Sequence, residues 1–285
     1  MTAHQTIKKY LTKVYISYRH SLFLLASILL VACSENVDKS QLSAVEVEFW
    51  YQQQVIDCQR TIEYQAIDWR LQHLALFVSD ISISLNSQIQ PVTLVNNDWQ
   101  NSGTALLHLA AKDCSVLPTD NVISERHASI TIPTTRLLFD KPLRLDETSQ
   151  LSFTLGLPFA INHLDPLSQP APINQPSMFW SWRGGHKFLR LDMQSDEHAW
   201  NFHLGSTGCS AASAMRSPQQ ECLHPNRLEF SLPRQENGYK LIVHLDKLLS
   251  GLELNTKSSC LMQTDNRSCG QLMNNLTNNG VFEWR

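Results

Sequence analysis

The chain has 285 residues, of which 42% are hydrophobic, and it carries 23 Lys+Arg against 26 Asp+Glu for a formal net charge of −3. A basic leader holds four of the positive charges and none of the negative ones, so the remainder carries 19 against 26, or −7. No basic stripe is left, which argues against nucleic acid or an anionic lipid surface as the partner. The remainder, about 250 residues, is long enough to bury one sizeable core.

Residues 1–32 predict an export signal. Four basic residues precede an apolar run over 22–32, and this run of about eleven residues is too short to span a bilayer, which takes roughly 20. The run ends in Leu-Val-Ala before Cys33, which resembles a bacterial lipobox whose cysteine becomes lipidated; the alternative is a plain secretory signal. Ser34 follows, in place of the aspartate that favours inner-membrane retention. We therefore expect a lipid at Cys33, a flexible tether over 33–44, and a periplasm-facing protein held at the outer membrane by its lipid anchor alone.

The residues from 45 onward predict an all-β fold. Val45, Val47 and Phe49 alternate with glutamates, as in a half-buried strand. Further strands are expected at 74–85, 91–95, 105–109, 128–132, 151–155, 178–182, 187–193 and 200–204. Only 244–254 fits a helical face, and the Asn- and Ser-rich stretch beyond Cys260 is expected to be loop. The spacing predicts a single β-sandwich-like domain over 45–285 with long Pro-rich loops.

Six cysteines follow Cys33. An even number in an oxidising compartment indicates disulfides, and six cysteines allow fifteen connectivities. Short loops are the easiest to close. The pairs that we expect are Cys58–Cys114, Cys209–Cys222 and Cys260–Cys269. Metal-binding thiolates are the alternative, although the sequence contains no CxxC pair.

Five prolines between 158 and 176 cannot continue a sheet, because proline lacks the N–H of the ladder, so an ordered loop is expected there. The following strand would place Trp180 and Trp182 side by side on one face. Such a pair is typical of a core or of a sugar-stacking surface. Met178 and Met193 could be soft copper ligands, but methionine more often fills gaps in a core.

Other residues with chemical potential have ordinary interpretations. A lone strand histidine such as His203 is usually structural, and spacing alone assigns no metal, since imidazole suits zinc, copper, iron and nickel. Asp165 and Asp192 could serve as the acid and base of a hydrolase, but no nucleophile accompanies them. They are also plausible acceptors for the ring N–H of a metal-binding histidine. The sequence therefore does not indicate an enzyme.

An ordered set of motifs in the central segment resembles one known family. The motifs are Asn162-His163, Trp180-x-Trp182, Lys187-Phe188, the segment 202–209 (FHLGSTGC), and Cys222 with Pro225-Asn226-Arg227. They resemble the MbnP-like copper-binding proteins encoded beside methanobactin operons, also described as metallo-mystery pair four-Cys motif proteins. Weaker matches upstream extend the resemblance over most of residues 45–230.

The resemblance implies a copper site built on a modified tryptophan. In this family the first Trp of the Trp-x-Trp pair is oxidised to kynurenine by a partner diheme protein of the cytochrome c peroxidase/MauG type, and the product holds one Cu(I). In this chain the corresponding tryptophan is Trp180, and the resemblance implies His163 and His203 as the imidazole ligands. Further candidates, as ligands or as groups that orient them, are His186, Trp182 and Asp165. His186 stands where the family commonly has an aromatic residue. The implied role is copper acquisition or homeostasis.

A rival interpretation is a glycan-binding or outer-membrane interaction module, with Trp180 and Trp182 as a stacking platform and the histidines structural. The two interpretations differ in geometry. The glycan interpretation requires both rings exposed on a flat surface and His163 far from His203. The copper interpretation requires the two imidazoles to converge on one ion, with each nitrogen about 2 Å from the metal.

Overall fold

The computed structural model describes residues 43–56, 61–110, 135–235, 238–262 and 266–285. Strands are the predominant regular structure among these residues. The strands are β1 Ala44–Tyr51, β2 Gln54–Val55, β3 Thr61–Tyr64, β4 Ile67–Leu85, β5 Gln88–Pro91, β6 Gln100–Asn101, β7 Thr104–Ala110, β8 Arg136–Leu138, β9 Thr148–Leu155, β10 Phe179–Ser181, β11 Gly185–Gln194, β12 Ala199–Gly205, β13 Leu228–Pro233, β14 Lys240–His244 and β15 Phe282–Trp284. The helices are α2 Phe159–Asn162, α3 Leu245–Leu249 and α4 Arg267–Asn278, with 3-10 turns η3 Leu145–Glu147, η4 Pro166–Ser168, η5 Pro176–Met178 and η6 Thr256–Ser258. The strand expected at 128–132 lies outside the described residues.

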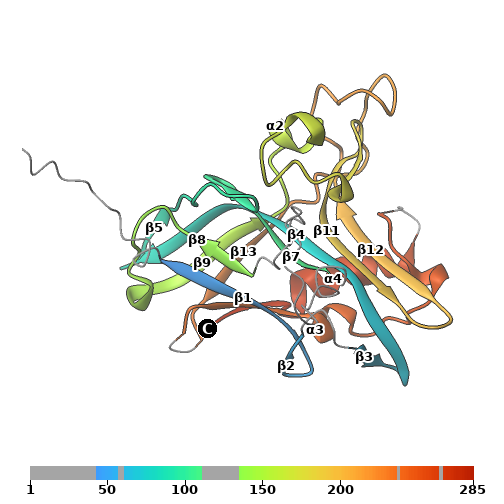
Figure 1. The fold of residues 1–285 in the computed structure, drawn as a ribbon, viewed down its shortest axis with the longest axis horizontal. Coiled ribbons are helices and arrows are strands. Elements are labelled where there is room, and N and C mark those ends of the chain that lie inside the picture. The colour runs from blue at the N-terminus through green and yellow to red at the C-terminus, as the bar shows by residue number, and fades with distance from the viewer. Residues whose placement is uncertain (1–42, 57–60, 111–134, 236–237, 263–265) are drawn as a thin grey trace, which may run out of the picture. The chain divides into compact units, whose positions relative to one another are not determined.

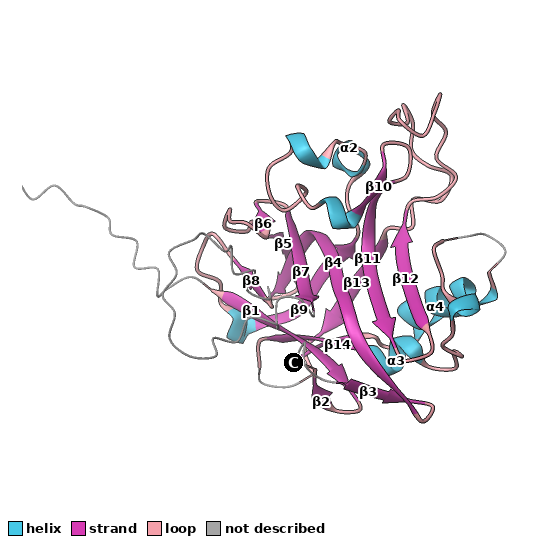
Figure 2. Cartoon of the chain, turned by 45° about the vertical axis from the view of Figure 1, so that its right-hand side comes forward, coloured by secondary structure: helices cyan, strands magenta, loops and turns pink. Residues whose placement is uncertain are grey.

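Strand β4 organises the larger sheet and pairs with β3, β5, β7, β9 and β11. Its first half lies between β11 and β7, with Leu76 opposite Leu189 on one side and Leu107 on the other. Its second half lies between β9 and β5, where Ile83 is opposite Leu151 and Gln90. Figures 1 and 2 show β4 crossing the fold as one long strand. The sequence predicted only the part from Leu74 onward. Before it, exposed and buried residues alternate, with Trp69 and Leu71 buried and the polar residues next to them exposed.

The smaller sheet has the order β15-β14-β1-β2, with β8 also paired to β1. The alternation predicted for β1 is confirmed, since Val45, Val47 and Phe49 are buried and the residues between them are not. The two sheets meet where Phe153 of β9, Phe230 of β13 and Phe282 of β15 contact one another, with ring centroids 4.6 to 5.4 Å apart. The predicted β-sandwich-like architecture is therefore confirmed.

Two helices follow β14. Helix α3 agrees with the predicted apolar face, because Leu245, Leu248 and Leu249 are all buried. The expectation of loop beyond Cys260 was wrong, since α4 occupies 267–278. Its buried Asn275 donates hydrogen bonds of 2.8 Å to the carbonyls of Leu248 and Ser250, so an amide ties α4 to α3. The sequence did not predict this helix, because the segment is rich in asparagine and one of the buried positions, Asn275, is itself an asparagine.

Two of the three expected disulfides are present, Cys209–Cys222 and Cys260–Cys269. The lipidation candidate Cys33 and the expected pair Cys58–Cys114 lie outside the described residues. Within the described ranges, no helix has the length and apolar character needed to cross a membrane.

Candidate metal-related site

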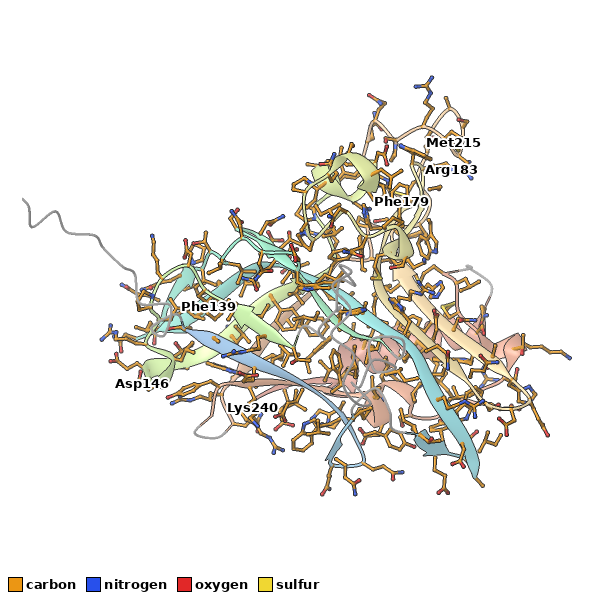
Figure 3. All side chains as sticks on the ribbon, viewed as in Figure 1. Phe139, Asp146, Phe179, Arg183, Met215 and Lys240 are labelled. Carbon is orange, nitrogen blue, oxygen red and sulfur yellow. A yellow bond between two sulfur atoms is a disulfide. The ribbon has the colours of Figure 1, made fainter. Side chains whose placement is uncertain are left out.

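Two long connections meet at one end of the larger sheet. The first joins β9 to β11 and contains the predicted proline-rich loop, in which α2, η4 and η5 are short helical turns. The second joins β12 to β13 and contains the Cys209–Cys222 disulfide. They are linked by a hydrogen bond of 3.2 Å from Arg183 N to the Ala214 carbonyl. Figure 3 shows Phe179, Arg183 and Met215 in this loop region, well away from Phe139 and Asp146.

Asn162 fastens the two connections to the sheet. Its Oδ1 accepts from the backbone N–H of His186 at 2.9 Å, and its Nδ2 donates to Ser206 Oγ at 3.2 Å. Gly185 has φ +74°, and a Cβ there would lie 2.7 Å from Asn162 Oδ1. Only glycine therefore fits both this backbone conformation and this close approach.

His163 follows directly and is buried at 3% exposure. Its Nδ1 lies 3.1 Å from the Trp182 carbonyl, which can only accept, so Nδ1 carries the proton and Nε2 the lone pair. Nε2 lies 3.2 Å from the Asn162 amide and 3.6 Å from Cys222 Sγ. Burial lowers the pKa of His163, which keeps the ring neutral. Metal-binding histidines usually donate their second ring N–H to such an acceptor, so this orientation is compatible with a ligand role for Nε2.

His163, Cys209 and Cys222 form a group whose candidate ligand atoms all lie within 4.8 Å of one another. The two cysteines are joined in a disulfide, so they offer no thiolate in this state. The imidazole is the better donor of the three. Among the described residues, His163 and His203 do not occur together in any cluster of three or more such ligand atoms.

Trp180 lies against glycines of two neighbouring segments. A Cβ on Gly205 would fall 2.6 Å from Trp180 Cζ3, and one on Gly184 would fall 3.5 Å from Trp180 Cβ. The indole also borders an open cavity of about 440 Å³. The other lining residues are Arg183, Gly184, Ser206, Thr207, Gly208, Cys209, Leu261 and Met262. Trp180 is therefore half-buried and within reach of small molecules.

Trp182 differs from the expectation that it would share a face with Trp180. Strand β10 ends at Ser181, so Trp182 lies in the turn and strand alternation no longer applies. Its ring packs edge-on against Phe179, with centroids 5.7 Å apart, and both tryptophans are only partly exposed. This arrangement does not form the flat two-ring platform of the glycan-binding alternative. Met178 and Met193 are buried core residues, in agreement with their ordinary interpretation.

His203 belongs to β12 and to the polar face of the larger sheet. Its Nε2 lies 2.7 Å from Asp192 Oδ1, and Asp192 Oδ2 lies 2.6 Å from Arg190 Nη2. The expectation that Asp192 accepts from a candidate ligand is met, and the bond leaves His203 Nδ1 as the ring's acceptor. Gly205 is two residues along the same strand, so the Trp180 ring lies on the same face, about 7 Å along the strand from His203.

The remaining candidates have structural partners. The His186 ring is fully buried, with Nδ1 2.6 Å from the Asn162 carbonyl and Nε2 3.1 Å from the Ile173 carbonyl. Burial lowers the pKa of His186 and favours the neutral ring, whose single N–H donates to one of these two carbonyls of the proline-rich loop. Asp165 caps η4 by accepting from Leu167 N at 3.0 Å.

Two further histidines, His73 and His108, share this polar face and were missed from the sequence. His108 lies in the predicted strand 105–109, whereas His73 lies one residue before the predicted strand 74–85, and their position opposite Ala75 and Asp192 follows only from the register of β4 with β7 and β11. The only available signal was a single histidine at the start of one apolar run and another inside a second one.

Substitution of Asp192 by asparagine should flatten the acid dependence of stability. Burial raises the pKa of Asp192, but the hydrogen bond from His203 and the charge of Arg190 outweigh burial and lower it. A lowered folded-state pKa stabilises the protein above the unfolded value, near 4, and this contribution is lost as pH falls. We expect D192N to cost about 1–3 kcal/mol at pH 7 and to lose less on acidification to pH 3.

Urea unfolding of metal-free protein between pH 7 and pH 3 measures this difference. The matched control is D196N, since Asp196 pairs with Arg70 on the surface and its side chain is 88% exposed. Equal acid slopes for D192N and the wild type would show that Asp192 does not supply the effect.

The fold and these contacts define a β-sandwich protein with a candidate His/Cys metal-binding group at one end of its larger sheet. The sequence profile of the MbnP family matches residues 40–263, and the chain belongs to that family. The solved structure of MbnP from Methylosinus trichosporium is similar, with a TM-score of 0.67 and 19% identity over 81% of this chain and 86% of that one. At this identity the likeness shows the fold. The curated proteins contain no match to the chain.

Proposed function

We propose that the protein is a non-enzymatic, periplasm-facing lipoprotein that binds one copper ion as Cu(I) after Trp180 is oxidised to kynurenine. The observation that carries the proposal is the convergence of the family-matching motifs. Trp180 borders the cavity together with Ser206, Thr207 and Cys209, and its ring lies over Gly205 on the face that holds His203. Membership of the MbnP family supports a metal-related role.

The donor set around Trp180 suits a soft cation. His203 is oriented by Asp192 and keeps one ring nitrogen as an acceptor, and His163 has the same property through the Trp182 carbonyl. Met262 lines the cavity and offers a thioether, a ligand that suits Cu(I). We assign His203 to the Trp180 site, because both lie on one face of the sheet. His163 is the candidate on the disulfide side of the cavity.

Oxidation of Trp180 supplies the donor that indole lacks, since the indole nitrogen lone pair belongs to the aromatic system. The C2–C3 bond breaks and each of these carbons gains one oxygen atom, with one water molecule formed for each oxygen taken from peroxide. Hydrolysis then removes C2 as formate, leaving an aryl amine and a ketone with a mass gain of about 4 Da. The proposed oxidant is peroxide acting through a diheme partner of the cytochrome c peroxidase/MauG type.

The leader supports the proposed location. An apolar run that ends at Cys33 fits a lipid anchor, and residues 33–44 would tether the β domain to the outer membrane. In that position the protein would serve copper acquisition or homeostasis.

The test compares protein produced with and without the diheme partner. We expect the peptide that contains Trp180 to gain about 4 Da only with the partner. We also expect the copper content to rise by one ion per chain in the same sample. Tight copper binding at this site with Trp180 unmodified would contradict the kynurenine part of the proposal.

A further inference from the structure

We propose that His73 and His108 form a second metal site, a two-imidazole pair for a soft monovalent cation of the Cu(I) or Ag(I) type. The pair is separate from the site proposed at Trp180 and does not depend on oxidation of that residue. His73 lies on β4 and His108 on the neighbouring strand β7. Their rings contact each other edge to face, with centroids 5.6 Å apart and an interplanar angle of 68°.

This separation suits a shared ion. With each nitrogen about 2 Å from the metal, two imidazoles place their centroids between about 5 Å apart at a tetrahedral N–metal–N angle and about 6.3 Å apart at a linear one. Asp192 is opposite His73 in the register, but its oxygens are engaged by His203 and Arg190. The pair therefore rests on two imidazoles, and copper accepts imidazole nitrogen as a ligand.

His73 provides an independent indication of a ligand. The residue is only 8% exposed, and its Nε2 is buried without a hydrogen-bond partner among the described residues. Burial and the nearby charge of Arg190 lower the pKa of His73 to about 3, so the ring is neutral and no proton competes with a metal. A buried polar atom without a partner is costly, and a bound cation would satisfy it.

His108, the other member of the pair, is held in place by burial and by stacking on Trp99. It is 5% exposed, and its ring stacks on Trp99 with centroids 5.1 Å apart and an interplanar angle of 10°. The backbone of Trp99 is held on both sides. Its backbone N–H donates to Asn97 Oδ1 at 2.8 Å, and its carbonyl accepts from Leu106 N at 2.8 Å. Little ordering of the ring is then required when a metal binds.

The surrounding charges favour a monovalent ion. The charges of Arg190 and Lys187 lower the pKa of His73, and the carboxylate of Asp192 opposes them. Burial lowers the pKa of Lys187 to about 8, so this amine is still largely protonated at neutral pH. Repulsion from these cations doubles for a divalent ion, because the Coulomb energy scales with its charge. We therefore expect Ag(I) and Cu(I) to bind more tightly than Zn(II).

The experiment uses the mature chain carrying W180F, so that the first site does not contribute. Redox-inert Ag(I) is titrated against a competing chelator, and Cu(I) under anaerobic conditions follows. We expect one ion per chain, and we expect H73Q and H108Q each to weaken its binding at least about tenfold. The matched control is H224Q, which removes an exposed histidine and should bind as the parent does.

Two readouts separate loss of a ligand from loss of folding. Ag(I) should raise the Tm of the parent and of H224Q but not that of H73Q or H108Q, provided that each variant melts cooperatively. The imidazole ¹⁵N resonances of His73 and His108 should shift on binding. Equal affinity in the parent, H73Q and H108Q, tighter binding of Zn(II) than Ag(I), or no binding by the parent would each overturn the proposal. None of these results bears on copper binding by the oxidised Trp180 site.

Discussion

Substitution of Gly205 by alanine should destabilise the protein by about 1–3 kcal/mol and push the Trp180 ring out of its position. The added Cβ would lie 2.6 Å from Trp180 Cζ3 and 2.8 Å from the His186 carbonyl oxygen. The carbonyl belongs to the backbone of β11 and cannot rotate away as a side chain can. The indole therefore has to move, although Gly205 itself is in an ordinary strand.

Urea unfolding measures the loss of stability, and tryptophan fluorescence reports the change around the ring. The matched control is G103A, because a Cβ at Gly103 meets no atom within 4 Å. Its free energy of unfolding should stay within about 0.5 kcal/mol of the wild-type value. If G205A were as stable as G103A, the close packing of Trp180 on β12 would be wrong. We further expect G205A to impair oxidation of Trp180, because the ring is no longer presented at the cavity.

The fold could be predicted where one residue pattern decides it. The alternation of apolar and charged residues predicted strand β1, and the prolines predicted that the connection before β10 lies outside the sheet. The short separation in sequence predicted the disulfides Cys209–Cys222 and Cys260–Cys269. Helix α4 could not be recognised in this way, because buried Asn275 takes its role from carbonyls of another helix. Tertiary contacts decide such positions, and the local composition does not.

The candidate site shows a similar division. The motifs identified Trp180, His163 and His203, and the structure places them around one loop end and the adjoining sheet face. Their partners depend on geometry that the sequence does not contain. A turn after Ser181 sends Trp182 toward Phe179, and strand register brings Asp192 to His203. Sequence position alone gave no reason to choose Asp192 over Asp165, which caps its own turn.

Substitution of Trp180 by phenylalanine should strongly weaken copper binding at the proposed first site. Phenylalanine keeps an aromatic ring against Gly205 but has no pyrrole ring to open, so no aryl amine or ketone can form. We expect affinity for Cu(I) to fall at least about 100-fold, or about 2.7 kcal/mol, in protein produced with the diheme partner. The measurement is made in the H73Q background, so that the second pair does not contribute.

The matched control for this substitution is W50F in the same background. Trp50 is also half-buried, but it lies on β1 of the smaller sheet and donates to Glu48 Oε2 at 2.8 Å, away from the cavity. W50F should still gain about 4 Da in the peptide that contains Trp180 and should still bind one Cu(I). Copper affinity in W180F equal to that in W50F would remove the modified tryptophan from the site. In that event His203 with Asp192, His163 and Met262 would remain as the ligands to be tested, because each lies on this face or around this cavity independently of the indole.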